Sequence, residues 1–430
     1  MAHSRRLQAL GAALAAVGGV VAAAAWWLGA GVALDTREPA PATIALAGAA
    51  VSTAHALREE GVRLYAAGQF PAACERFDRA AEHEPASTAR RRDLAGCFEG
   101  WAWQAMREGR AEEAMLLFRR GLRATPDAPD LLTGLGVAAI HAGRAGEAVE
   151  PLERAVSADP RVPARLLLAR LYDQRDEAAQ ALAHLRAVVT AEPEHEGARR
   201  LFDKIERERQ AESGFRRMTT PHFVIKYRGS REAEARRVLP RLLEATYERV
   251  GTQLGYRPLD RVTVVLYENA EFRHVAGVHP WVSGLFDGKI RLPLGPALPP
   301  APMLERLLVH EYAHAAVHDL SRGRAPRWLQ EGLAQVLEGA SAEAGPRVPD
   351  DFDLAGLDAL IAQADPARAR VGYDVALWIV QDLATRGGTP PMRALLTRLG
   401  MGEPVAAVIP GVYGLRLAEL ESYWRQRLGV

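Results

Sequence analysis

A repeating pattern between residues 54 and 210 constrains the fold of this chain more than any other feature. Five aligned columns recur in four units at steps of roughly 34 residues, and the first step is longer because of an insertion near 86–94. The columns hold Gly61, Ala102, Gly136, Ala169; Gly68, Gly109, Gly143, Asp176; Ala73, Ala114, Ala148, Ala181; Phe77, Phe118, Leu152, Leu185; and Pro85, Pro126, Pro160, Pro193. A plain alanine-rich helical bundle would not keep this register, so we predict stacked helical hairpins.

The pattern resembles the tetratricopeptide repeat (TPR). In that repeat small residues stand where two helices cross, a glycine stands in the turn, and a proline follows the second helix. The resemblance implies an α-solenoid over residues 54–211, capped by a charged helix at Ala198–Ala211. Stacked repeats present a concave face. We therefore expect a protein partner on that face.

A second feature is the sequence His-Glu-Tyr-Ala-His at residues 310–314, inside an apolar segment that runs from Met303 to Leu320. On a helix, His310 and His314 lie one turn and about 40° apart, so both imidazoles can share one metal ion. Glu311 lies on the flank of that face, where it can contact a water on the metal. The alternative is a surface helix with two solvated histidines. The apolar flanks count against it, because a glutamate beside buried histidines is costly without a partner.

The segment 326–334 provides a third ligand. Ser321 and Gly323 stop the first helix, and Pro326 suits the first turn of a new one. Two short antiparallel helices would bring Glu331 onto the histidine pair. Two histidines, one glutamate and an open position make up a catalytic zinc site. His318 is an alternative ligand one turn beyond His314, although a solvated or supporting histidine fits that position better.

The two segments together resemble the gluzincin metallopeptidases, specifically the bacterial peptidase MA-like domains that often follow TPRs. The resemblance covers roughly residues 215–430. It implies Zn²⁺ held by His310, His314 and Glu331, with Glu311 as general base. The chain departs from the thermolysin-type pattern at Gln335, where those enzymes carry an acidic residue that orients a ligand histidine. Gln335 can donate a hydrogen bond but carries no charge.

The resemblance also implies a small β-sheet ahead of the metal helix. Segments 222–228 and 261–267 read as strands, 231–254 as a helix, and Asp287-Gly288 as the turn of a hairpin between 284–286 and 289–292. In the family, the sheet edge above the site pairs with extended substrate. Lys289, Ile290 and Arg291 are the candidate substrate-binding edge; an ordinary edge with protective basic residues is the alternative.

Residues 346–430 read as a helical lobe that closes the other side of the cleft. Its helices are expected at 354–364, 372–386, 392–400 and 415–428. The resemblance implies that a Tyr or His of this lobe stabilises the oxyanion, and Tyr373, at the start of a helix, is the candidate. A half-buried tyrosine with its hydroxyl in water is the alternative.

The N-terminus predicts a membrane anchor. Arginines at positions 5 and 6 precede an uncharged run to Leu34 that is long enough to span a bilayer. Residues 1–34 would then be a signal-anchor and 35–53 a linker. The chain would be single-pass in the bacterial inner membrane with its bulk extracytoplasmic, or secreted after cleavage. The alternative is a buried helix of a soluble protein.

The net charge bears on the expected partners, and the two cysteines bear on the expected disulfide. The 54 basic and 53 acidic residues give a net charge of +1, so we expect no nucleic acid partner. Cys74 and Cys97 could form a disulfide in an oxidising compartment. We expect instead two free core cysteines on neighbouring helices, because helical cores accept cysteine readily.

These patterns predict a membrane-anchored zinc metallopeptidase with an α-solenoid followed by an α+β zincin-like lobe at 215–345 and the helical lobe. Peptides or proteins would be its substrates. The alternative is a scaffold protein of the cell envelope that keeps the zincin fold but is weak or inactive in catalysis.

Overall fold

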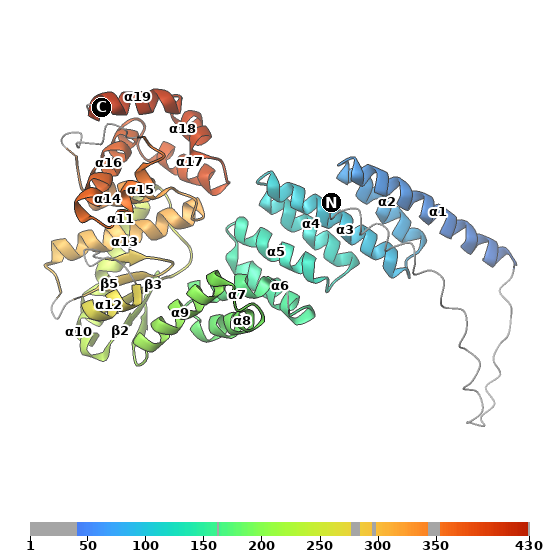
Figure 1. Cartoon of the computed structure of the whole chain (residues 1–430), viewed down its shortest axis with the longest axis horizontal. Coiled ribbons are helices and arrows are strands. Elements are labelled where there is room, and N and C mark those ends of the chain that lie inside the picture. Colours follow the sequence, from blue (N-terminus) through green and yellow to red (C-terminus); the bar gives the residue numbers. More distant parts are fainter. Residues whose placement is uncertain (1–40, 161–162, 277–283, 295–297, 343–352, 429–430) are drawn as a thin grey trace. The chain divides into compact units, whose positions relative to one another are not determined.

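The computed structural model describes residues 41–160, 163–276, 284–294, 298–342 and 353–428. These residues are mostly helical with one small mixed sheet (Figure 1). Residues Ala54–Val430 group into one compact unit. We call 54–211 the repeat array and 216–428 the C-terminal region. The boundary between them, near 211–215, stays a prediction from the sequence.

The repeat array consists of helical hairpins followed by one more helix. Its helices are α1 (Pro41–Ala66), α2 (Phe70–His83), α3 (Thr88–Arg107), α4 (Ala111–Ala124), α5 (Pro129–His141), α6 (Ala145–Ala158), α7 (Ala164–Gln174), α8 (Ala178–Ala191) and α9 (Glu196–Ala211). The four residues of the second sequence column all adopt the left-handed conformation of a turn. Gly68, Gly109, Gly143 and Asp176 have φ angles of 73°, 75°, 75° and 62°.

The small residues of the first column allow the helices of a hairpin to approach closely. A Cβ atom at Gly136 would lie 2.5 Å from Leu152, and one at Gly61 would lie 3.2 Å from Phe77. Ala102 and Ala169 are fully buried at the equivalent positions. The predicted register of the repeats is therefore confirmed in the packing.

Two expectations for the first part of the chain need correction. Helix α1 begins at Pro41, so residues 41–53 of the expected linker 35–53 are helical. Cys74 and Cys97 are joined in a disulfide between α2 and α3, not free. Helices α2 and α3 pack against each other with the two Cα atoms 5.5 Å apart, a separation that suits a disulfide. The expected signal-anchor at 1–34 lies outside the described residues, and no described helix is long and apolar enough to cross a membrane.

A five-stranded sheet opens the C-terminal region. Its strands are β1 (Arg216–Thr219), β2 (Phe223–Tyr227), β3 (Val262–Tyr267), β4 (Leu285–Phe286) and β5 (Ile290–Pro293), in the order β1-β2-β3-β5-β4. The pairs β2–β3 and β3–β5 are parallel, and β1 and β4 are antiparallel edges. The hairpin expected at Asp287-Gly288 joins β4 to β5, and Gly288 has a φ of 101°.

The elements between the strands are η1 (Gly229–Arg231), α10 (Glu232–Arg237), α11 (Leu239–Leu254) and α12 (Asn269–Ala276). The single helix expected at 231–254 is interrupted at Val238 because Pro240 has no amide hydrogen for a continuous helix and suits a new first turn instead.

Side chains alternate between the two faces of the sheet. One face, which includes Ile225, Val264 and Ile290, joins the large core shared with the helices that follow. The opposite face places Val265 and Tyr267 against α12. The large core contains α13 (Ala301–Ser321), α14 (Arg327–Glu338), α15 (Leu357–Ile361), α16 (Pro366–Thr385), α17 (Thr389–Gly400), α18 (Val405–Tyr413) and α19 (Leu417–Leu428). Helix α18 was not expected from the sequence.

Candidate metal centre

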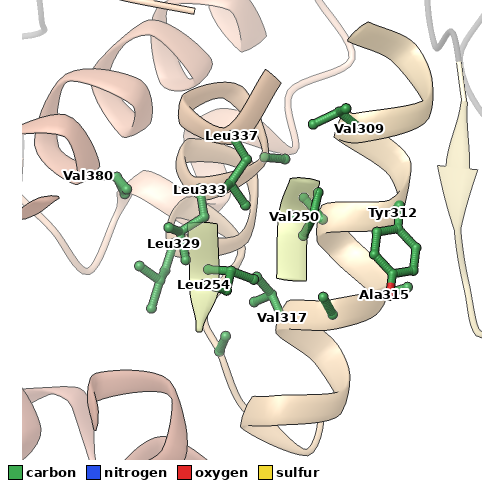
Figure 2. Close-up of a cluster of buried hydrophobic side chains, with 14 of the residues drawn as sticks. Val250, Leu254, Val309, Tyr312, Ala315, Val317, Leu329, Leu333, Leu337 and Val380 are labelled. Carbon is green, nitrogen blue, oxygen red and sulfur yellow. The ribbon is translucent and has the colours of Figure 1, made fainter. Parts of the chain in front are cut away.

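Helices α13 and α14 are positioned by an apolar seam. Figure 2 shows Val309 near Leu337 at one end and Val317 near Leu329 at the other, so the two helices run antiparallel. The turn between them holds Arg322 and Gly323 in the left-handed conformation, with φ angles of 52° and 70°. This is the tight helical hairpin that the sequence predicts, and it lays the two helices side by side over several turns.

The polar side of the same hairpin brings the three predicted ligands together. The Nε2 atoms of His310 and His314 are 3.3 Å apart, and Oε2 of Glu331 lies 3.6 Å and 3.4 Å from them, respectively. Among the described residues, these three form the cluster able to hold a metal ion. A tetrahedral ion with ligand bonds of about 2.0–2.1 Å needs donor atoms about 3.3–3.4 Å apart. The donor triangle therefore fits zinc and leaves one coordination position open.

The charges around the donors also suit a cation. Burial pushes the pKa of His310 down, but hydrogen bonds to Glu331 and Glu338 outweigh it and raise this pKa to about 10. Burial acts to raise the pKa of Glu331, but the two histidines hold it well below its usual range. Carboxylates thus surround the imidazoles, and their negative charge favours the binding of a cation at this site.

Glu311 is buried beside this cluster, with 3% of its surface exposed. Its Oε2 atom is buried and has no hydrogen-bond partner among the described residues. Burial raises the pKa of the Glu311 carboxyl above its usual range. A buried carboxylate oxygen without a protein partner is costly unless a water, an ion or a substrate contacts it. Its place next to the ligands, without joining them, is the one expected of a general base.

Gly284, just before β4, leaves room for the Glu311 carboxyl group. A Cβ atom at position 284 would lie 2.2 Å from Oε1 of Glu311. Any side chain at 284 would therefore force the Glu311 carboxyl group or the strand to shift, although the φ of Gly284 is not in the left-handed region. Gly284 could not be identified from the sequence. It matters because of its contact with Glu311 on another element, and no neighbouring residue in the sequence indicates that contact.

The partner of His310 is not the one expected. Gln335 donates hydrogen bonds to the backbone carbonyls of Tyr373 (3.0 Å) and Glu331 (3.4 Å), so it does not support a ligand histidine. Instead, Oε2 of Glu338 lies 3.3 Å from Nδ1 of His310. Glu338 follows Glu331 by two helical turns and so shares its face of α14. Position 335 holds no acidic residue, and Glu338, about one turn later, supplies the carboxylate instead. Its seven-residue spacing from Glu331 is the sequence signal that could have identified it.

A cleft of about 1670 Å³ opens onto the donors, and Tyr373 lines it together with Gln330 and Leu285. Burial and the charges of Glu331 and Glu311 raise the pKa of the Tyr373 hydroxyl, which keeps it protonated at neutral pH. Tyr373 lies about two turns into α16, not at the start of a helix as expected, because α16 begins at Pro366.

His318 does not join the donor cluster. Its ring packs at 5.6 Å from the ring of Phe286, and burial lowers its pKa. His318 is therefore not one of the donors, as the sequence favoured, and its supporting role stays a prediction.

The expected substrate-binding edge is wrong. Strand β5 pairs with β3 on one side and β4 on the other, so it has no free edge. Ile290 points into the core, and Lys289 and Arg291, which alternate with it, point to the opposite face of the sheet. Strand β4 is the edge on this side, and its two residues line the cleft.

Lys289 and Arg291 belong instead to a buried ionic cluster between the sheet and helices α7–α9. Nζ of Lys289 lies 3.1–3.4 Å from carboxylates of the array, and Arg291 pairs with acidic residues and the hydroxyl of Tyr267. The acidic members are Asp173, Asp176, Glu208, Glu212 and Asp287, and Lys204 and Lys226 complete the cluster. The two residues therefore join the C-terminal region to the repeat array.

Comparisons with known proteins concern the repeats. A family model for the tetratricopeptide repeat matches residues 105–163. Two solved structures of MamA, the second a D159K mutant, share 15% and 16% identity with TM-scores of 0.27 and 0.28. The matches cover 39% and 36% of this chain and 98% and 88% of the respective MamA chains. A thermophilic TPR protein of Thermus thermophilus shares 20% identity with a TM-score of 0.22, over 36% of this chain and 98% of its own. No curated protein matches. The array is thus a TPR-type helical solenoid, an architecture of protein-interaction scaffolds.

Proposed function

We propose that the C-terminal region is a zinc-dependent peptidase of the gluzincin type. The convergence of His310, His314 and Glu331 on one point, with donor separations suited to zinc, carries this proposal. When bound, zinc would supply Lewis acidity, which polarises a carbonyl group and lowers the pKa of a water ligand to about 7. The resemblance of residues 310–314 and 326–335 to the peptidase MA-like domains supports the same reading.

Each residue around the donors would have a separate role in hydrolysis. Glu311 would accept a proton from the attacking water and return it to the leaving amine. Burial raises the pKa of the Glu311 carboxyl above its usual range, which makes it a stronger proton acceptor and so favours this exchange. Tyr373, which stays protonated, would donate a hydrogen bond to the oxyanion. Glu338 would fix the orientation of the His310 ring.

The substrate would bind as an extended strand along β4. This strand is the sheet edge beside the cleft, and Gly284, Leu285 and Phe286 line that cleft. An edge strand offers unpaired backbone groups to a peptide. The TPR array would bind a protein partner or deliver the substrate. We also propose that residues 1–34 anchor the chain in the bacterial inner membrane, with an extracytoplasmic bulk; the Cys74–Cys97 disulfide fits an oxidising compartment.

Two variants test the enzymatic proposal. Glu311→Gln should keep zinc at one ion per chain and lose hydrolysis of a broad peptide library, whereas His314→Ala should lose both zinc and hydrolysis. Full activity in Glu311→Gln would refute the role of Glu311 as the base.

A second candidate is a scaffold without peptidase activity, and the comparisons favour it because the family match lies within the repeats. In that case the chain would hold zinc but cleave no peptide. Metal analysis together with a casein and peptide-library assay separates the two proposals.

A further inference from the structure

Two arginines occupy equivalent positions in the two metal-binding helices. Arg306 precedes His310 by four residues in α13, and Arg327 precedes Glu331 by four residues in α14. Residues four apart share one face of a helix. Both arginines are exposed and both line the cleft that opens onto the donors. Arg327 also acts electrostatically on the Tyr373 hydroxyl, which places it near the reacting end of the cleft.

The antiparallel hairpin puts these arginines on opposite sides of the donors. His310 contacts Glu338, near the end of α14, and His314 contacts Glu331, nearer its beginning. Arg306 therefore lies beyond the Glu338 side of the site, and Arg327 lies beyond the His314 side. Each is about 6 Å of helix rise from its ligand. One cation thus stands at each end of the stretch of cleft that the donors occupy.

Neither arginine side chain is committed to a polar contact with another described residue. Within the part of the chain that the structure describes, the side chains of Arg306 and Arg327 make no hydrogen bond or ion pair. Other charged side chains that line the cleft, Arg370, Asp374 and Glu338, are paired. Arg370 donates to Asp374 at 3.0 Å, and Glu338 contacts His310. The cleft therefore keeps two uncommitted guanidinium groups, whose planar fork matches a carboxylate.

We propose that Arg306 and Arg327 are specificity-determining residues that bind carboxylate groups of a peptide on the two sides of the metal centre. This inference rests on the proposed peptidase function and names its substrate class, which is acidic peptides. The carboxylate could come from an aspartate or glutamate side chain or from a free C-terminus, and the two sources present the same chemistry to an arginine.

The test uses the full chain and a matched set of fluorogenic peptides. One group carries glutamate near the cleavable bond and an amidated C-terminus. A second carries glutamine at the same positions and a free C-terminus. A third carries glutamine and an amidated C-terminus, so that it has no carboxylate. The ratio of kcat/KM between the first and third groups reports side-chain recognition, and the ratio between the second and third reports C-terminal recognition.

The variants are Arg306→Gln, Arg327→Gln and the corresponding lysine substitutions. Each glutamine variant should lower kcat/KM for carboxylate peptides about tenfold, the effect of losing a hydrogen bond to a charged group. It should leave the peptides without a carboxylate unaffected. The lysine variants should recover part of the loss, because lysine keeps the charge but not the fork. Arg237→Gln in α10, an exposed arginine outside the cleft, is the matched control.

A binding assay separates this inference from the proposed function. Fluorescence anisotropy measures the affinity of the same peptides for the Glu311→Gln chain, which needs no turnover. If no peptide is cleaved but carboxylate peptides bind in an Arg306- or Arg327-dependent manner, the peptidase proposal fails and the inference stands. If peptides are cleaved or bound equally with and without carboxylates, or if the arginine variants do not alter a preference, the inference is wrong. Absence of all binding also refutes it.

Discussion

The Oε2 atom of Glu338 lies 3.3 Å from Nδ1 of His310, on the side of the imidazole that faces away from the other donors. A carboxylate in this position fixes the ring orientation and strengthens the histidine as a ligand. Glu338→Gln should therefore weaken zinc affinity by about 10- to 100-fold. Gln335→Ala should change it little, because Gln335 bonds only to backbone carbonyls. A chelator competition assay measures both affinities, and a larger loss in the Gln335 variant would contradict this assignment.

The space beside Glu311 gives a second prediction. Gly284→Ala would place a Cβ atom 2.2 Å from Oε1 of Glu311, so the carboxyl group or the β4 backbone must shift. We expect hydrolysis to fall strongly while zinc still binds, because the three atoms nearest to that Cβ all belong to Glu311 and none belongs to a donor residue. Parallel metal analysis and peptide turnover check this. Gly96→Ala, where a Cβ meets nothing within 4 Å, is the control. Equal activities in the two variants would show that the space is not needed.

The ionic cluster predicts how stability depends on pH. Asp176 is the left-handed turn residue of its repeat, and Lys226 and Lys289 contact its carboxylate at 2.9 Å and 3.1 Å. Burial raises the pKa of Asp176, but the two lysines outweigh it and lower this pKa below its usual value. A lowered folded-state pKa stabilises the protein above the unfolded value of about 3.9, and this stability is lost as pH falls through the folded value.

Asp176→Asn tests this dependence, because asparagine tolerates the left-handed backbone but carries no charge. The variant should lose about 2 kcal/mol of unfolding free energy at neutral pH. Its difference from the original chain should shrink as pH falls below about 4. Urea unfolding across pH measures both values, with the exposed Asp203→Asn as control. A difference that stays constant with pH would rule out the charge as its cause.

The disulfide between Cys74 and Cys97 predicts a redox-dependent stability of the first repeats. The bond joins residues separated by 23 positions, and its loss should cost about 3 kcal/mol by relaxing the unfolded chain. Reduction by dithiothreitol should lower the stability of the original chain but not that of a Cys74→Ala, Cys97→Ala double variant. Denaturant unfolding with and without reductant measures this. If reduction has no effect on the original chain, the bond contributes nothing to stability.

Much of this structure could be predicted because the relevant signals are local or periodic. The turn column ends in Asp176, not glycine, yet all four of its members take a positive φ, because each hairpin repeats the same backbone geometry. The spacing of His310 and His314 fixes their shared helix face in the same way. Pro326 and Gly323 marked the hairpin that brings Glu331 to them.

The errors came from contacts between elements that are distant in sequence. The alternation of Lys289 and Arg291 with apolar residues was visible, but the choice between an edge strand and an inner strand depends on where β4 pairs. The two residues are buried because the array supplies their acidic partners. The partner of His310 and the role of Gly284 likewise follow only once α14 and β4 are placed against α13.

X-ray absorption at the zinc edge, on the full chain loaded with one equivalent of zinc, shows whether His310, His314 and Glu331 hold the metal. We predict two imidazole nitrogens and a shell of oxygen ligands at about 2.0–2.1 Å, with one imidazole lost in His314→Ala and the carboxylate lost in Glu331→Ala. A spectrum without two imidazoles, or one that neither substitution changes, would mean that these residues do not hold the metal.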